Sequence, residues 1–269
     1  MGCKIDFISN TYLVTPMIFS DSTYIGIDPT SANKSFTYAA LDHDLNLITL
    51  ADGEMEDIHA FLVEQRSAVV AVNAPSGVSR GLVRERMKKK MVTPRPIQRV
   101  EMRVAEFELR ERGIHIAGTS SKEGLCFEWM KVGFELYRKL KKMGFINYPK
   151  SDSVYQVLET NPHACFCVLA GQIPLAKPSL EGRLQRQLIL YERGIRIKDP
   201  MDFFEEITRY KLSKGVWPTE LLYSPEQLDA LAAAYTAWLA ANKPENISTI
   251  GIPKEGLIVL PEKELKEKY

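Results

Sequence analysis

Residues 68–77 read AVVAVNAPSG, an apolar run that stops at a polar turn. Five consecutive small or β-branched side chains are typical of a strand that is buried on both faces of a sheet. Proline and glycine follow directly, so the strand is predicted to end at Asn73. Such a strand indicates an α/β fold in which helices cover both faces of the sheet.

The chain before this strand predicts the other half of a mixed sheet. Short runs rich in β-forming residues cover residues 24–28, 35–41 and 45–50, and a polar turn separates the last two. Residues 54–66 carry apolar side chains at helical spacing and are predicted to form a helix. Strand, hairpin, helix and buried strand in this order begin an α/β domain with a mixed sheet.

The chain after this strand is predicted to be mainly helical, with one further strand over residues 154–158. Helical spacing and helix-end signals predict helices over residues 127–142, 180–192, 201–212 and 224–241. Two short apolar runs near the end predict a closing hairpin over residues 247–252 and 257–260.

The composition of the 269-residue chain is that of a globular protein, with 45% hydrophobic and 26% charged residues and a formal net charge of +1. No apolar run approaches the roughly 20 residues that span a bilayer, and the first residues lack a signal-peptide pattern, so we expect no membrane partner. Cys165 and Cys167 beside His163 provide too few ligands for a structural zinc site. We therefore expect buried free thiols in a cytoplasmic protein.

Three predicted strands end in a polar side chain, namely Asp28, Asn73 and Glu159. In an α/β sheet, sites form at the carboxyl ends of the strands, so these groups are candidates for one site. A fourth acid, Asp229, lies in the first turns of the helix that is predicted to begin at Ser224. Taken singly, each acid has a simpler explanation, because acids often form turns or interact with the dipole at the start of a helix.

Small side chains on the last predicted helix favour convergence of these acids. Ala233 and Ala237 share a face with Asp229 at four-residue spacing, and Ala230 lies beside them. A face of alanines lets a helix lie close to a sheet, which would bring Asp229 to the strand ends. Carboxylates held together have raised pKa values unless a cation neutralises them, and Mg²⁺ and Mn²⁺ prefer such oxygen ligands. The pattern predicts metal-assisted phosphate chemistry.

The segment from Arg80 to Arg103 is strongly basic, with nine Lys and Arg residues against two Glu and a net charge of +7. Arg80, Arg84, Lys88 and Lys89 are candidates for contacts to the phosphates of nucleic acid. No aromatic residue is interleaved with them, so base stacking on this segment is not predicted. The alternative is a solvated helical face whose charges pair with acidic helices elsewhere in the chain.

Several short motifs occur in a characteristic order along the chain. They are Gly26-Ile27-Asp28, residues 72–77, Glu159 followed by Pro162, Leu228-Asp229-Ala230 and the closing residues 251–261. This series resembles domain-of-unknown-function family 429, a group regarded as predicted nucleases of the ribonuclease H-like superfamily.

The resemblance implies the fold and the domain organisation. We expect an α/β, ribonuclease H-like domain over residues 24–261, with a central five-stranded mixed sheet in the order 3-2-1-4-5 flanked by helices. Residues 80–150 would form a basic, helical insertion between strands 4 and 5, and a C-terminal hairpin would close the domain. Residues 1–23 would be an N-terminal extension and residues 262–269 a polar tail.

The resemblance also implies an activity, a metal and a site. A divalent-metal-dependent nuclease or phosphodiesterase acting on nucleic acid would bind Mg²⁺ or Mn²⁺ through Asp28, Glu159 and Asp229, with Asn73 as a neutral ligand. A further motif that resembles the family consists of Lys177, Gly182, Arg183 and Arg186. It implies that Lys177, Arg183 and Arg186 contact phosphate or nucleic acid.

Asn73 departs from the family pattern, which usually has an aspartate there. A carboxamide offers an oxygen but no charge, so metal affinity should fall. One alternative is therefore a catalytically inactive module of the same fold that binds nucleic acid or protein. A second is a nucleotide-binding protein of the actin and sugar-kinase architecture, although Asp28-Pro29-Thr30-Ser31 lacks the glycine that such proteins place after this acid. No P-loop or dinucleotide fingerprint is present, and His115 and His163 are candidate general acids or bases.

Overall fold

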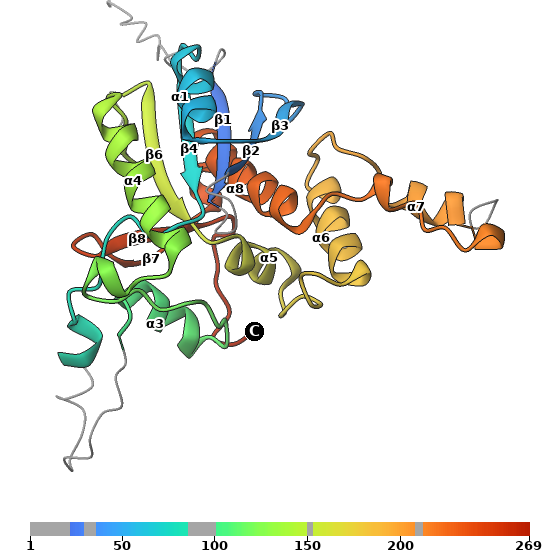
Figure 1. Cartoon of the computed structure of the whole chain (residues 1–269). Coiled ribbons are helices and arrows are strands. Elements are labelled where there is room, and N and C mark those ends of the chain that lie inside the picture. The colour runs from blue at the N-terminus through green and yellow to red at the C-terminus, as the bar shows by residue number, and fades with distance from the viewer. Residues whose placement is uncertain (1–21, 30–35, 86–100, 150–152, 208–211) are drawn as a thin grey trace, which may run out of the picture.

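The computed structural model describes residues 22–29, 36–85, 101–149, 153–207 and 212–269. Its centre is an eight-stranded mixed sheet in the order β3-β2-β1-β4-β6-β8-β7, with β5 paired to β6 off this path (Figure 1). The strands are β1 (Thr23–Pro29), β2 (Phe36–Leu41), β3 (Leu47–Gly53), β4 (Ala68–Val72), β5 (Ile146–Asn147), β6 (Tyr155–Thr160), β7 (Ser248–Ile252) and β8 (Gly256–Leu260).

Five of these strands have the predicted order, because β3-β2-β1-β4-β6 corresponds to 3-2-1-4-5 in the numbering used for the prediction. The predicted number of strands is wrong, since a short strand in the insertion and the closing hairpin enlarge the sheet to eight. Two strands share one edge of β6: β5 pairs at Gln156 and Val157, and β8 pairs at Glu159 and Thr160. The predicted closing hairpin is therefore present and belongs to the sheet.

The direction of the strands determines where a site can form. β1, β4 and β6 are parallel, with Ile27 opposite Val72 and Val72 opposite Glu159. β2 runs antiparallel to both β1 and β3. The carboxyl ends of the three parallel strands therefore meet at one edge of the sheet, and Asn73 extends the pairing there by donating from its backbone N to Ile27 O at 2.9 Å.

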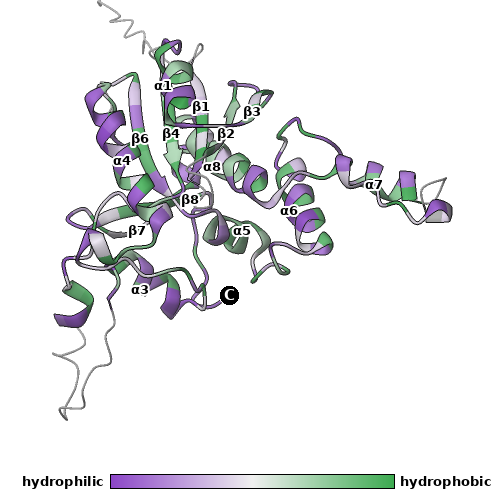
Figure 2. Ribbon diagram, viewed as in Figure 1, coloured by the Kyte–Doolittle hydropathy of each residue, from purple (hydrophilic) through white to green (hydrophobic). Residues whose placement is uncertain are grey.

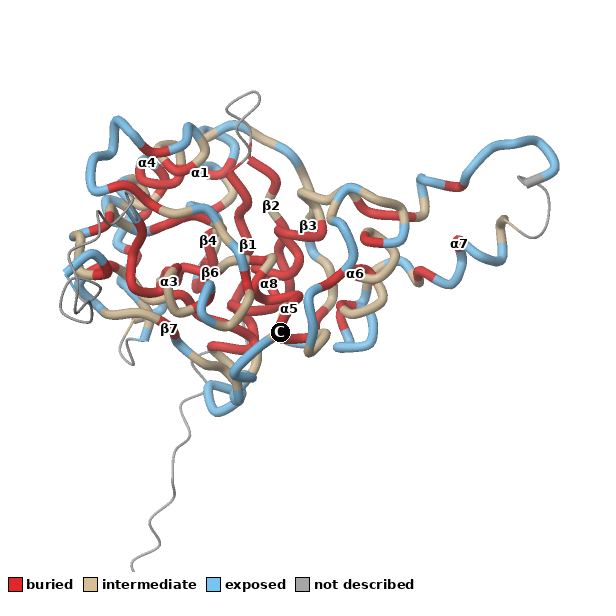
Figure 3. The backbone as a smooth tube through the Cα atoms, turned by 90° about the horizontal axis from the view of Figure 1, so that it is seen from below, coloured by how far each residue is buried: buried red, intermediate tan, exposed pale blue. Residues whose placement is uncertain are grey.

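Helices cover both faces of the sheet (Figure 3). On one face lie α5 (Pro162–Ala170), α6 (Leu180–Glu192) and α8 (Pro225–Asn242), and on the other α1 (Met55–Val63) and α4 (Glu128–Lys142). Val69 and Ala71 of β4 pack under α8, whereas Val70 and Val72 pack against α1 and α4. Because β4 is covered twice, its whole sequence is apolar, and the central strands are mainly hydrophobic in Figure 2.

The start of α8 is fixed by a capping box, as its sequence suggests. Gln227 N donates to Ser224 Oγ at 3.1 Å, and Ser224 N donates to Gln227 Oε1 at 2.9 Å. Pro225 occupies the first position of the helix, where no N–H is needed. Residues 228–240 of α8 are all buried, so this helix lies inside the molecule and its first turns place Asp229 at the carboxyl edge of the sheet.

The segments outside this core differ from the sequence-based expectations in two ways. The projecting α7 (Met201–Glu206) is shorter than the helix predicted over residues 201–212, of which residues 208–211 lie outside the described part (Figure 1). The predicted polar tail is attached to the domain: Tyr269 N donates to Arg112 O at 2.9 Å and Lys266 Nζ to Gly171 O at 2.6 Å. The described residues also include α3 (Val104–Glu111), η1 (Glu123–Leu125), η3 (Leu212–Lys214), η4 (Thr219–Leu221) and η5 (Pro244–Asn246). None of the helices described is long and apolar enough to cross a membrane.

Candidate functional site at the carboxyl edge of the sheet

Four polar residues, which we call the aspartate cluster, meet at this edge: Asp28, Asn73, Lys177 and Asp229. Asn73 Nδ2 donates a hydrogen bond to Asp28 Oδ1 at 2.6 Å, and Lys177 Nζ lies 2.5 Å from Asp229 Oδ2. Asp28 and Asp229 are only 6% and 5% exposed, whereas the Lys177 side chain is 39% exposed. The cluster is therefore buried at its carboxyl groups and reaches solvent at the lysine.

Close packing of α8 on β1 brings the two aspartates together. A Cβ atom at Gly26 would lie 2.0 Å from Ala230 O and 2.3 Å from Ala234 N, so only glycine fits beneath the helix. Gly26 and Asp28 face the same side of β1, and Asp229 directly precedes Ala230. The predicted close approach of the alanine face is confirmed, and it sets Asp229 beside Asp28.

Burial controls the charge of the aspartate cluster. Together with the charge of Asp229, it raises the pKa of Asp28 to about 7, while Lys177 and the hydrogen bond from Asn73 act in the opposite direction. Burial also raises the pKa of Asp229, against the opposing charge of Lys177. Burial alone would lower the pKa of Lys177, but the Asp229 carboxylate outweighs it and the pKa lies above the ordinary lysine value. Asp28 is thus partly protonated at neutral pH.

The stability of the protein should depend on this proton. A carboxyl group whose pKa is raised by folding stabilises the protein below its unfolded pKa of about 4, and this contribution is lost as the pH rises through the folded pKa of about 7. We expect the unfolding free energy, measured in EDTA, to fall by roughly 2 to 4 kcal/mol across this window because of Asp28. Asp28→Asn should lack this fall and be more stable than the wild type at about pH 8.

Urea denaturation at a series of pH values measures this effect. Asp44→Asn is the control, because Asp44 lies on an exposed turn and its substitution should leave the pH profile of the wild type unchanged. Parallel profiles for the wild type and Asp28→Asn would show that folding does not raise the pKa of Asp28.

The loop that carries Lys177 is held against α6 by a second glycine. A Cβ atom at Gly182 would lie 1.9 Å from Ala176 O, so the residue before Lys177 contacts the backbone of the helix. Ser179 caps α6 by accepting a hydrogen bond from Gly182 N at 3.0 Å. Gly182, which forms part of the family resemblance, thus helps to position Lys177 next to Asp229.

Arg183 and Arg186, which the resemblance placed at a phosphate, bind backbone carbonyls instead. Arg186 is 2% exposed, and its Nη1 donates to Leu175 O and Gly182 O, both at 2.9 Å. Arg183 donates from Nε to Tyr223 O at 2.8 Å, just before α8 begins. Both guanidinium groups therefore stabilise the segments that carry the aspartate cluster, whereas Lys177 is the predicted cation that lies within it.

Glu159 lies on the opposite face of the sheet from the aspartate cluster. Val157, two residues earlier in β6, packs against α1 and α4, and Glu159 must share that face. The residue on the side of α8 is Thr160, whose Oγ1 lies 3.1 Å from Cys165 Sγ of α5. The predicted convergence of Asp28, Glu159 and Asp229 does not occur, and within the described residues no three His, Cys, Asp or Glu side chains form a metal-binding group.

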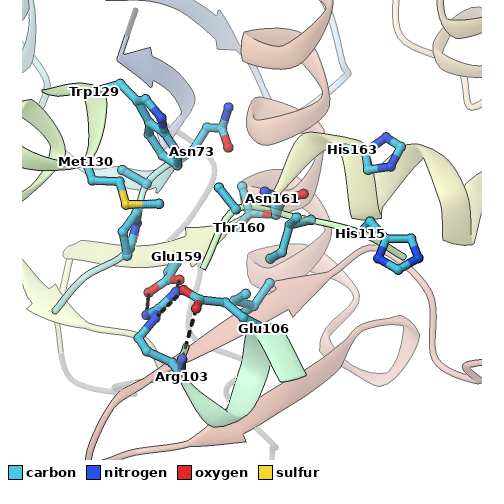
Figure 4. Close-up of a pocket in the computed structure, with 15 residues that line it drawn as sticks. Asn73, Arg103, Glu106, His115, Trp129, Met130, Glu159, Thr160, Asn161 and His163 are labelled. Atoms are coloured by element: carbon cyan, nitrogen blue, oxygen red, sulfur yellow. Dashed lines mark hydrogen bonds and ion pairs between the residues drawn. The ribbon is translucent and has the colours of Figure 1, made fainter. Parts of the chain in front are cut away.

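Glu159 is instead bound to Arg103 in a buried ionic network (Figure 4). Arg103 Nη1 donates to Glu159 Oε2 at 2.9 Å, Nη2 contacts Oε1, and Nε donates to Glu106 Oε1 at 2.8 Å. Ser76 N also donates to Glu159 Oε2, at 2.8 Å. The network therefore fixes the turn that follows β4, next to Asn73.

The closing motif of the chain completes this network. Glu255 accepts hydrogen bonds from Arg80 N at 2.6 Å and Val104 N at 2.9 Å. A Cβ atom at Gly256, where φ is +100°, would lie 2.5 Å from Ser76 Oγ. These roles were not predicted from the sequence, where the local signal is the three-residue spacing of Arg103 and Glu106 that matches the capping box at the start of α3.

The residues of the basic segment from Arg80 to Arg103 differ in their exposure to solvent. Arg80 and Arg84 are exposed, as a phosphate-binding role requires. Lys88 and Lys89 lie outside the described residues. Arg103 was counted as part of the basic surface, but it is 1% exposed and its charge is neutralised by Glu159 and Glu106. The cationic surface is accordingly smaller than the sequence suggested.

A pocket of about 230 Å³ is lined by Asn73 of the aspartate cluster and by the network of Arg103, Glu106 and Glu159 (Figure 4). Trp129 and Met130 line one side, and His115 and His163 line the other. Burial, together with the charges of Arg186, Lys177 and His115, lowers the pKa of His163 and so favours the uncharged ring. Sequence analysis noted the histidines but gave no reason to connect Trp129 with this site.

Comparison with known proteins identifies the family. The model of a family described as "Protein of unknown function (DUF429)" matches residues 26–255, and the chain belongs to this family. No match was found among curated proteins. The matched region contains Asp28, Asn73, Lys177 and Asp229.

Proposed function

We propose that this member of the DUF429 family is a nuclease that hydrolyses phosphodiester bonds of nucleic acid at the aspartate cluster with one divalent cation. The observation that carries the proposal is the pair of buried carboxyl groups, Asp28 and Asp229, held together by β1 and α8. The strand order β3-β2-β1-β4-β6 supports, as part of the same proposal, an assignment to the ribonuclease H-like superfamily.

The donor set suits one hard cation such as Mg²⁺ or Mn²⁺. Two carboxylates and the carboxamide oxygen of Asn73 are oxygen ligands of the type these ions prefer. A second cation fits less well, because Asn73 contributes no charge and Lys177 already neutralises Asp229. Each additional positive charge would lie in a cluster with little remaining negative charge.

The residues of the cluster have separate roles in this proposal. When bound, a divalent cation would polarise the phosphoryl group and lower the pKa of a water molecule. Asp28 and Asp229 would hold the cation through their carboxylate oxygens. Lys177 reaches solvent and can move from Asp229 to contact a phosphate oxygen as a point charge. Arg80 and Arg84 are exposed and supply further contacts to the nucleic-acid backbone.

Titration with Mn²⁺, followed by electron paramagnetic resonance, tests the cation site. We expect one bound ion, and an affinity that falls by about tenfold or more in Asp229→Asn because a carboxylate ligand is lost. Asn73→Asp should raise the affinity by about tenfold, since it adds a charge to the cluster. Lys177→Met should also raise it, because the ammonium group competes with the cation for Asp229.

Cleavage is measured in parallel with labelled single-stranded and duplex DNA and RNA in the presence of Mn²⁺. Asp44→Asn serves again as the exposed control, which should bind and cleave as the wild type does. Absence of Mn²⁺ binding in both the wild type and Asn73→Asp would refute the proposal.

A second candidate function is a nucleic-acid-binding module without hydrolytic activity. Asn73 and the Lys177–Asp229 ion pair favour it, because both reduce the charge available to a cation. In that case the wild type would bind nucleic acid without cleavage, and Asn73→Asp alone would not restore turnover.

A further inference from the structure

The pocket beside the aspartate cluster has aromatic walls. Trp129 of α4 lies on one side of Asn73, and the rings of His115 and His163 lie on the other (Figure 4). Pockets for drug-sized ligands measure roughly 300 to 1,000 Å³, so a volume of about 230 Å³ suits a single ring system. Asn73 belongs to both sites, because it lines the pocket and donates to Asp28.

Trp129 is positioned by close contact of α4 with the turn after β4. A Cβ atom at Gly133 would lie 2.3 Å from Ala74 Cβ, so the helix rests directly on this turn. Trp129 lies one helical turn before Gly133 on the same face, which places its ring beside Asn73. Tyr137, one turn further on, donates to Ala74 O at 3.2 Å and holds the same face in place.

The charged side chains at the floor of the pocket are held rigidly and already have hydrogen-bond partners. Arg103, Glu106 and Glu159 form it, and their charged groups are paired with one another. A ligand would therefore form its specific contacts with the walls. His163 Nε2 lies 3.8 Å from Cys167 Sγ, so the other ring nitrogen, Nδ1, is the one left for a ligand. Asn73 and Asn161 line the pocket as well, and each uses part of its carboxamide within the protein: Asn73 Nδ2 donates to Asp28, and Asn161 Oδ1 accepts from Ala164 N.

We propose that this pocket binds the base of a nucleotide whose phosphate lies at the aspartate cluster. The placement of the phosphate rests on the proposed function. Trp129 provides a flat face for stacking, and Asn73, Asn161 and His163 provide hydrogen-bonding groups for the edge of the base. Because Asn73 contacts Asp28, a base in the pocket and a phosphate at the cluster can belong to one nucleotide.

Nucleosides and ribose 5-phosphate are suitable probes, because the first contain a base and the second contains sugar and phosphate without one. Isothermal titration calorimetry in EDTA should show that at least one of adenosine, guanosine, cytidine and uridine binds. We expect ribose 5-phosphate to bind about tenfold more weakly than that nucleoside. Trp129→Ala should weaken nucleoside binding by about tenfold, and Trp129→Phe, which keeps an aromatic face, by less than about threefold.

Two further variants keep this test decisive. His115 is exposed, so His115→Ala should fold normally and still weaken nucleoside binding by about threefold. Trp217→Ala is the matched control, since Trp217 is 53% exposed and does not line the pocket. Failure of all four nucleosides to bind would overturn the proposal, as would binding that neither Trp129→Ala nor His115→Ala weakens.

Asp229→Asn separates this proposal from the proposed function. Asp229 does not line the pocket, so its substitution should abolish cleavage and leave nucleoside affinity unchanged. If nucleosides bind in a way that depends on Trp129 but the protein cleaves no nucleic acid, the base-binding pocket is supported and only the proposed nuclease activity is contradicted. If the protein cleaves nucleic acid but binds no nucleoside, only the proposal of a base-binding pocket is contradicted.

Discussion

Gly26→Ala is expected to destabilise the protein by about 3 kcal/mol and to separate the two aspartates. The new methyl group would lie 2.0 Å from Ala230 O and 2.3 Å from Ala234 N. Both are backbone atoms of a buried helix, so no change of side-chain conformation relieves the overlap and α8 must move away from β1. Asp229 moves with α8, and the pKa of Asp28 should then fall towards its ordinary value because both burial and the neighbouring charge decrease.

Gly124→Ala is the matched control for this prediction. No atom lies within 4 Å of a Cβ placed at Gly124, so the same chemical change meets open space. Its unfolding free energy should equal or slightly exceed that of the wild type, because alanine restricts the unfolded chain. Denaturation in urea compares the three proteins, and a Gly26→Ala variant as stable as Gly124→Ala would show that α8 does not rest on β1 so closely.

The elements that sequence predicted well are those specified by a short segment. The helix predicted over residues 180–192 has these bounds in the structure, and the capping box at Ser224 marks the start of α8. The strand at residues 68–72 was equally clear, because a strand covered on both faces is apolar throughout. The enlargement of the sheet was not predictable, since nothing in the hairpin sequence specifies that β8 pairs with Glu159 and Thr160.

The candidate site was predictable where two independent signals agreed. Asp28 lies at the end of β1, Asn73 follows the parallel strand β4, and the alanines beside Asp229 allow the helix to approach. The prediction that Glu159 joins the two aspartates was wrong for a geometric reason, because Glu159 is in register with Val72 and not with Asn73. A difference of one residue reverses the face of a strand, and single-sequence reading rarely places strand ends that accurately.

Arg103 illustrates what sequence reasoning missed, because its role depends on partners far away in the chain. We expect Arg103→Met to destabilise the protein by about 3 to 5 kcal/mol, the cost of leaving buried carboxylates without their cation. Glu159 and Glu106 are 4% and 3% exposed, so the substitution would leave both side chains buried without their cationic partner. The turn at Ser76 should loosen as well, since Glu159 binds its backbone N.

A charge mechanism can be distinguished from a simple loss of packing by a second substitution. Adding Glu159→Gln to Arg103→Met should recover part of the lost stability, because the amide carries no charge. Arg138→Met is the control: Arg138 forms an exposed pair with Glu123 at 3.3 Å, and its loss should cost less than about 1 kcal/mol. A loss of stability that Glu159→Gln does not reduce would mean that Arg103 contributes by volume rather than by charge.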